Sequence, residues 1–425
     1  MDPTRTRHAP RTRPAANSPD AATAPGKRRA SVVVMRDTST LSRFVPAWEE
    51  LAATALEPNV FYEHWMLLPA LKALGAQKSI YVVLILIHDI RNPEAPPKLG
   101  GLLPLEFIPR FRKLGVSAFS LWQHVHCYVC TPLLRADAAR ECMVELIRWF
   151  RSGATGVPLI ELRCISGDGP FHKMLVDLSN ELGLLSWVTD IFTRGLWREE
   201  QGENSDAESG VSGDLRRRLR RKERRLNERG RLEHLVLRPE DDVGRWIDEF
   251  LQIEASGWKG QQGSALAASE GDRRYFVEIA TAAFRRGRLL MLGLNFDGRP
   301  IARRCAFVAG EGSFAFKTAY DEAFADYSPG AMLEMDNIRQ LNELRGVRWM
   351  DSCAATDNLL VNRLANDRRT IQSIAVGGGA LGELVISGLP LLRWTNRRIL
   401  KKFSDASAES LAGPPESGSS RDPQD

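Results

Sequence analysis

Apolar and polar positions alternate along the chain with two periods, one typical of strands and one typical of helices. In the first half, β-branched and apolar runs predict strands at 31–35, 80–88, 100–108, 159–164 and 185–192, with an aromatic, β-rich run up to 134. Helical spacing separates these runs at 41–51, 63–74, 136–150 and 170–182. Strands interleaved with helices of these lengths are typical of a mixed α/β (α+β) sheet.

The second half repeats a similar order after a segment rich in Glu, Asp, Ser and Gly at 199–214. Its strands are expected at 232–237, 289–296, 301–308, 313–319, 347–350 and 371–376, and its helices at 215–229, 243–254 and 273–286 and from 329 and 359 onward. We therefore predict two related lobes of similar topology that face one cleft, 31–198 and 215–402, joined by the acidic linker 199–214. The strand at 371–376 is expected to close the second lobe. The basic tail 1–30 and the acidic tail 403–425 have the composition of disordered segments.

Composition indicates a soluble, cytoplasmic protein of two domains. The 425 residues are 43% hydrophobic and 26% charged, with a net charge of +5, which is ordinary for globular proteins. Six Cys without a regular framework fit a reducing compartment. The N-terminal segment lacks the apolar run of a secretory signal, and the longest apolar runs, such as 80–87, are too short to span a bilayer.

The most informative segment surrounds the end of the strand at 313–319. Polar residues stand at the strand end (Lys317, Tyr320 and Asp321), and Ser328-Pro329-Gly330-Ala331 then opens a helix. The free N–H groups and the positive dipole end of such a helix attract anions, and small residues let a pyrophosphate approach the backbone. Alternatively, Ser328 is only a helix cap and Pro329 only a first-turn residue.

Two further segments could carry chemistry. Asp351 follows the strand at 347–350, where a carboxylate can orient an amine or take its proton. Asp357, a little further on, either contacts substrate or caps the next helix. Cys353 is disfavoured as a nucleophile because no His lies near it in the sequence. Trp258 and Lys259 stand in a Gly-rich loop, where they could form a substrate wall and a charge clamp.

Basic and metal-like patterns are weaker signals. Residues 215–231 hold ten Lys and Arg, which could contact phosphates, but interleaved leucines favour a solvated helix with one apolar stripe. The absence of aromatic residues there disfavours nucleic-acid binding. The basic stretch 397–402 could associate weakly with a membrane surface. The run from His124 to Cys130 lacks the second ligand pair of a zinc site, so we predict no metal. On a strand, His126 would instead line the cleft.

Taken together, these segments resemble a known family. The motifs EASGWKG (254–260), GSAL (263–266), FKTAYDE (316–322), SPG (328–330) and DSCA (351–354) look like those of the GNAT-superfamily acetyltransferases associated with bacterial cellulose and exopolysaccharide biosynthesis (CelD-like). That family is related to the Fem-type aminoacyltransferases, which carry two GNAT lobes. The resemblance is clear from about 215 to 376 and looser before that. One departure is the standard pyrophosphate loop, Arg/Gln-x-x-Gly-x-Gly/Ala, which 326–331 does not match.

The resemblance implies tandem GNAT-like lobes and an N-acyltransferase. In the family pattern, such an enzyme uses acyl-CoA, in particular acetyl-CoA, to modify a small amine or sugar acceptor in polysaccharide or envelope biosynthesis. The expected catalytic residues are Tyr320 as acid or positioner, Asp321 or Asp351 as base, and Lys259 and Lys317 as charge clamps. The donor phosphates are expected at Tyr327, Ser328, Pro329, Gly330 and Ala331, and the acceptor at Trp258, His126 and Asp357. Two alternatives stay open: a Fem-type transfer from aminoacyl-tRNA, and a non-catalytic protein that binds a sugar or envelope component.

Overall fold

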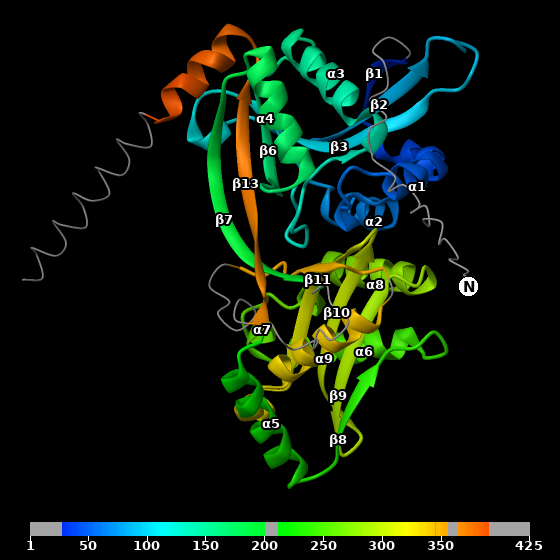
Figure 1. Ribbon diagram of the computed structural model, residues 1–425, viewed down its shortest axis with the longest axis vertical. Coiled ribbons are helices and arrows are strands. Elements are labelled where there is room, and N and C mark those ends of the chain that lie inside the picture. Colours follow the sequence, from blue (N-terminus) through cyan, green and yellow to red (C-terminus); the bar gives the residue numbers. More distant parts are fainter. Residues whose placement is uncertain (1–27, 200–210, 345, 356–363, 391–425) are drawn as a thin grey trace, which may run out of the picture.

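The computed structural model describes residues 28–199, 211–344, 346–355 and 364–390 (Figure 1). In the first half, the helices are α1 (Val45–Ala53), α2 (His64–Leu74), α3 (Ala139–Arg151) and α4 (Pro170–Leu182). The strands are β1 (Arg28–Met35), β2 (Ile80–Asp89), β3 (Lys98–Ile108), β4 (Ala118–Leu121), β5 (Leu133–Leu134), β6 (Leu159–Ser166) and β7 (Ser186–Arg198). The mixed α/β prediction is confirmed, and the element bounds agree closely with the periodic pattern.

The second half begins with the basic helix. Its helices are α5 (Gly213–Asn227), α6 (Val243–Ser256), α7 (Trp258–Gln261), α8 (Glu270–Arg285) and α9 (Pro329–Glu343), with the short 3-10 helix η6 (Glu322–Tyr327) before α9. Its strands are β8 (Leu232–Val236), β9 (Leu289–Phe296), β10 (Arg299–Ala309), β11 (Gly312–Tyr320), β12 (Trp349–Asp351) and β13 (Asp367–Gly377).

The two sets of strands join into one sheet of 13 strands. Its order is β1-β2-β3-β4-β6-β13-β7-β12-β11-β10-β9-β8, with β5 paired to β3. The expectation that the strand at 371–376 closes the second lobe is wrong, because β13 lies between β6 and β7 of the first half. Most of β13 is buried, so its side chains complete the core there. In Figure 1, β7 and β13 run together from one half of the molecule toward the other.

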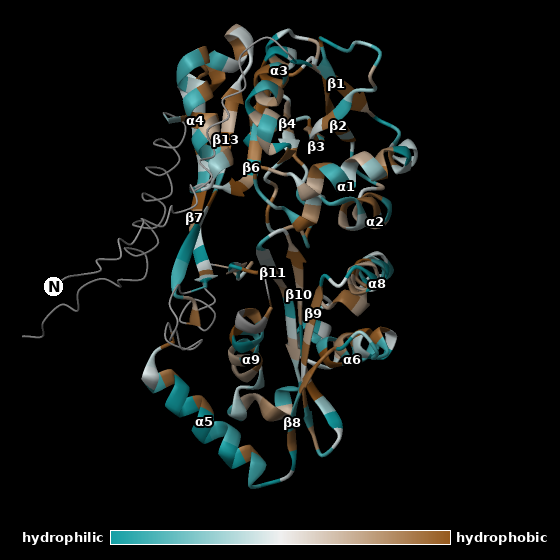
Figure 2. Cartoon of the chain, turned by 45° about the vertical axis from the view of Figure 1, so that its right-hand side comes forward, coloured by the Kyte–Doolittle hydropathy of each residue, from teal (hydrophilic) through white to brown (hydrophobic). Residues whose placement is uncertain are grey.

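In the second half, helices cover both faces of the sheet. Neighbouring strand residues point to opposite sides, so the partners of two adjacent residues show which helix lies on each face. On β10, Arg303 bonds to Glu249 of α6, whereas the adjacent Arg304 bonds to Glu334 and Asn337 of α9. Figure 2 shows α6 and α8 on one side of β9, β10 and β11, and α9 on the other. This layering places the N-terminus of α9 beside the end of β11.

Helix α5 lies at the far end of the second half and is largely hydrophilic (Figure 2). Its three leucines, Leu215, Leu219 and Leu226, are buried against the core that contains α9. The predicted apolar stripe is therefore confirmed. None of the helices that the structure describes is long and apolar enough to cross a membrane. The basic stretch 397–402 lies outside the described residues, as do residues 1–27, the acidic tail and most of the acidic linker. Residues 28–30, predicted as part of the disordered basic tail, instead begin strand β1.

Candidate active site

The candidate site is built where β11 and β12 part. The two strands pair in parallel only from Gly312 to Phe314, opposite β12, whereas β11 continues to Tyr320. Among the described residues, no strand pairs with 315–320 on that side. The β10–β11 register also shifts at Phe316, which has no partner between Ala315 and Lys317. Such a bulge turns backbone groups and side chains away from the regular ladder.

A buried carboxylate, Glu254 at the end of α6, organises this region. Its Oε1 atom lies 3.2 Å from Lys259 Nζ and 3.7 Å from Lys317 Nζ. Its Oε2 atom accepts a 2.8 Å hydrogen bond from the Leu266 amide. Burial lowers the pKa of Lys317, and Glu254 opposes that shift. The structure thus brings together the two lysines predicted as charge clamps, around a carboxylate that sequence analysis did not single out.

Trp258 and Tyr320 border the same place. A small cavity of about 30 Å³ is lined by both residues together with Glu254, Lys259 and neighbouring atoms. The Trp258 side chain is exposed, its amide donates to Glu322, and the Lys259 ammonium lies 5.9 Å from its ring centroid. The expected substrate wall therefore stands next to the expected clamp, because the turn after α6 carries both.

His126 reaches this cluster from the first half of the chain. It lies in a loop and not on a strand as expected, and its ring is buried. Nε2 is 2.8 Å from Asp272 Oδ1 on α8, and the ring stacks on Tyr275. Burial lowers the pKa of His126, and the charge of Lys317 adds to the shift. Of the described residues, no three His, Cys, Asp or Glu side chains are grouped as metal ligands.

The start of α9 differs from a simple capped helix. Ser328 adopts a left-handed conformation (φ 58°) and makes no side-chain cap hydrogen bond. Its Oγ atom instead accepts a 2.7 Å hydrogen bond from Lys222 of the basic helix α5. Of the five residues predicted to bind the donor phosphates, Tyr327 and Ala331 are buried and therefore face the core. The α9 N-terminus thus presents backbone around Gly330, with a lysine beside it.

Gly330 lies directly against β11. A Cβ atom there would stand 3.6 Å from Tyr320 Cδ1 and 3.8 Å from Thr318 Cγ2, which are ordinary contact distances. Gly330 is not among the residues with positive φ, so a side chain at this position is not strained. Gly330 therefore brings the backbone of the α9 N-terminus close to the Tyr320 ring, so Tyr320 is the β11 side chain nearest to this helix end.

Asp321 and Asp351, the two residues predicted as bases, form hydrogen bonds and ion pairs within the protein. Asp321 is the N-cap of η6, where it accepts from the Ala323 amide at 3.0 Å, and it pairs with Arg299. Asp351 is completely buried between Arg194 (2.6 Å) and Arg369 (2.9 Å). Burial alone would raise the pKa of Asp351, but the two guanidinium groups lower it overall. Neither carboxylate is placed as a free base, because each is already bonded. Asp357 lies outside the described residues.

Comparisons with known proteins concern the fold and the part of the chain that holds this site. Residues 213–358 match the family model "Acetyltransferase (GNAT) domain". No curated protein matches the chain. The fold is similar to that of a conserved protein of unknown function from Bacteroides thetaiotaomicron VPI-5482, with a TM-score of 0.51 and 10% identity over 82% of this chain and 99% of that chain. It is also similar to FemX, with a TM-score of 0.50 and 10% identity over 80% of this chain and 96% of that chain. The chain therefore shares its mixed α/β fold with these two structures, and its residues 213–358 are similar to a GNAT acetyltransferase domain.

Proposed function

We propose that the protein is an N-acyltransferase that moves an acyl group, such as acetyl, from acyl-CoA to an amine or sugar acceptor. The observation that carries this proposal is the meeting of three features within the matched domain. These features are the parting of β11 from β12, the bulge at Phe316, and the Glu254–Lys259–Lys317 cluster. The resemblance to the exopolysaccharide-associated family supports an acceptor in polysaccharide or envelope biosynthesis and a cytoplasmic location.

The donor would bind along the free side of β11. Its phosphates fit the α9 N-terminus, where helix N–H groups attract anions, and Lys222 adds a positive charge beside Ser328. Tyr320 lies against Gly330, so it would position the donor near its phosphates. The arm of the donor would then run back along β11 toward the bulge, where backbone N–H groups can polarise the thioester carbonyl.

The reaction joins the acceptor nitrogen to the acyl carbon and breaks the carbon–sulfur bond. The acceptor must lose a proton and the leaving thiolate must gain one. Glu254 is the carboxylate best placed to orient the acceptor, since it lines the small cavity beside Lys259 and Tyr320, whereas Asp321 and Asp351 do not. Lys317, whose pKa burial lowers, can carry a proton beside it. Holding both reactants in one geometry supplies the rest of the catalysis.

Calorimetric titration with acetyl-CoA tests the donor site. Gly330→Val should weaken binding at least about tenfold, because its side chain fills the space where the phosphates approach the backbone. The matched control is Gly115→Val, since a Cβ atom at Gly115 meets nothing within 4 Å. The proposal fails if the native protein does not bind acetyl-CoA, or if Gly330→Val binds it as tightly as the native protein does.

One observation favours a second candidate, transfer from aminoacyl-tRNA. Most basic side chains of α5 point to solvent, including Arg217, Arg221 and Arg224, and they could contact an RNA backbone. The protein would then be retained on immobilised tRNA at moderate salt and would bind an aminoacyl-tRNA mimic but not acetyl-CoA. A non-catalytic binding protein would show neither donor affinity nor thiol release.

A further inference from the structure

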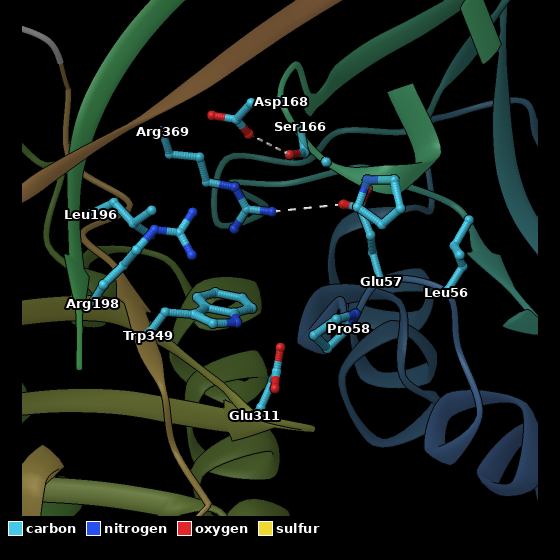
Figure 3. Close-up of a pocket in the computed structure, with 12 residues that line it drawn as sticks. Leu56, Glu57, Pro58, Ser166, Asp168, Leu196, Arg198, Glu311, Trp349 and Arg369 are labelled. Carbon is cyan, nitrogen blue, oxygen red and sulfur yellow. Dashed lines mark hydrogen bonds and ion pairs between the residues drawn. The ribbon is translucent and has the colours of Figure 1, made fainter. Parts of the chain in front are cut away.

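A second cavity lies at the junction of the two halves, with a volume of about 240 Å³ (Figure 3). The segment after α1 supplies one wall, and the end of β6 with the start of α4 supplies a second. The rest comes from β7, β12, β13 and the turn between β10 and β11. Its polar and aromatic lining consists of Glu57, Ser166, Asp168, Arg198, Glu311, Trp349 and Arg369. None of these residues belongs to the proposed transfer site.

The cavity is far from the α9 N-terminus. Trp349 of β12 pairs with Gly312 at the start of β11, whereas Gly330 packs on Tyr320 at its end. The eight residue steps from Gly312 to Tyr320 span roughly 26 Å at about 3.3 Å per step. A small ligand in the junction cavity would therefore not contact the donor phosphates.

The buried charges around the cavity already have partners. Arg369 bonds to Asp351 at 2.9 Å and lies 3.9 Å from Glu57 Oε2. Glu57 Oε1 accepts a 2.7 Å hydrogen bond from the Phe171 amide at the start of α4. A charged ligand would leave a buried group without its partner, which is costly. A ligand without net charge keeps these pairs intact.

Two exposed side chains, Arg198 and Glu311, can recognise hydroxyls beside their own ion pairs with Asp367 and Arg348. Arg198 holds Asp367 through Nε at 2.6 Å, and in Figure 3 its terminal nitrogens point into the cavity. Glu311 points in from the opposite side, next to the Trp349 ring. A hydroxyl both donates and accepts, so it can pair with a guanidinium and with a carboxylate. The ring of a tryptophan packs well against the C–H face of a saturated ring.

We propose that the junction cavity binds a neutral polyhydroxylated ring of the hexopyranose class. This site is additional to the proposed transfer site and does not depend on it. Because Glu57 belongs to the first half of the sequence and Trp349 and Glu311 to the second, an occupied cavity also links the two halves. Bound glycoside should therefore raise the melting temperature.

The test is ligand-observed NMR with methyl glucopyranoside on the full chain, with glucuronate and glucosamine as charged analogues of the same ring. We expect saturable binding in roughly the millimolar range, weaker binding of both charged analogues, and about a tenfold loss with Arg198→Gln or Glu311→Gln. The exposed Arg148→Gln change serves as the control and should have no effect. Gly330→Val should also leave glycoside binding unchanged, which separates this site from the donor site.

Three results would each overturn the proposal: no saturable glycoside binding, tighter binding of either charged analogue, or unchanged affinity in both cavity variants. Arg198 and Glu311 are exposed, so their substitution should leave the fold intact, and the melting temperature of each variant checks this.

Discussion

Two clusters in this molecule have the same charge composition, one carboxylate between two cations, and different surroundings. Asp351 is fully buried and is held by two arginines at 2.6 and 2.9 Å. Glu254 is also buried, but its two lysines stand at 3.2 and 3.7 Å and remain partly exposed beside a small cavity. The first cluster holds its carboxylate in short contacts away from solvent, although Arg369 also borders the junction cavity, whereas the second has contacts loose enough to exchange for a substrate.

The difference follows from the chemistry of the cations. The planar guanidinium group offers several donors in a fixed arrangement, which suits a permanent buried pair. An ammonium group is a compact charge on a flexible chain, and its pKa changes readily on burial. Arg194, Asp351 and Arg369 lie on β7, β12 and β13, so this cluster stabilises the place where the two halves join. We assign the Glu254 cluster to function and the Asp351 cluster to stability.

The largest expected effect comes from Asp351→Asn. Removal of the carboxylate leaves two buried arginines uncompensated, which should cost about 3–5 kcal/mol of unfolding free energy. Denaturant unfolding measures this, with Glu278→Gln as the control because it breaks only an exposed pair with Arg274. A loss equal to that of the control would mean that Asp351 does not hold the junction.

Lys317→Met should separate function from stability. The unfolding free energy should stay within about 1 kcal/mol of the native value, because methionine fills similar space and removes a charge that burial disfavours. Acyl transfer should fall by roughly 100-fold, because the proton carrier beside Glu254 is lost. The exposed Lys72→Met change on α2 is the control for both measurements. Native transfer rates in Lys317→Met would place the chemistry elsewhere.

A third cluster has the opposite composition, one histidine between two carboxylates. His234 Nδ1 lies 2.6 Å from Asp336 and Nε2 lies 3.2 Å from Glu223, and these hydrogen bonds raise the pKa of His234 from 6.5 to about 9. Because the pKa of His234 is higher in the folded protein than in the unfolded chain, its protonated ring stabilises the fold fully below pH 6.5. This contribution disappears as the pH rises toward 9. Thermal unfolding should show a loss of roughly 1–2 kcal/mol over that interval, after allowance for solvent screening. His234→Gln should remove this pH dependence, and an unchanged slope would refute the assignment.

The smallest effect is expected for the exposed arginines of α5. Replacing Arg217, Arg221 and Arg224 together by Gln should barely change the melting temperature, since exposed pairs contribute roughly 0–1 kcal/mol each. A cooperative loss of structure would show that the basic face, and not the buried leucines, holds the helix. If RNA is a ligand, the same change lowers its affinity and flattens its salt dependence.

Local patterns in the sequence were enough to predict most elements but not their assembly. The apolar runs at 289–296, 301–308 and 313–319 correspond closely to β9, β10 and β11, because strand periodicity is a local property. The insertion of β13 between β6 and β7 is a long-range pairing. No local pattern indicates which strands will be neighbours, so the position of β13 was missed.

The candidate site shows the same contrast between local patterns, which the sequence predicts, and tertiary contacts, which it does not. Trp258, Lys259, Lys317 and Tyr320 were predicted and do gather at one place, because a turn and a strand end carry them. Glu254 was missed as a functional residue although it begins the motif EASGWKG, since one acidic residue at a helix end looks ordinary. The pairing of Asp351 was not foreseen because its two arginines come from β7 and β13, far away in the sequence. Whether a carboxylate is free or paired depends on tertiary contacts.

The most direct test of the account is thiol release from acetyl-CoA in the presence of a panel of amines and amino sugars. The native protein should release thiol faster than buffer with at least one acceptor. Glu254→Gln should bind acetyl-CoA normally by calorimetry yet release thiol roughly 100-fold more slowly, whereas Glu278→Gln should match the native protein. Native rates of release in Glu254→Gln, or no release by the native protein with any acceptor, would contradict the assignment of transfer to this cluster.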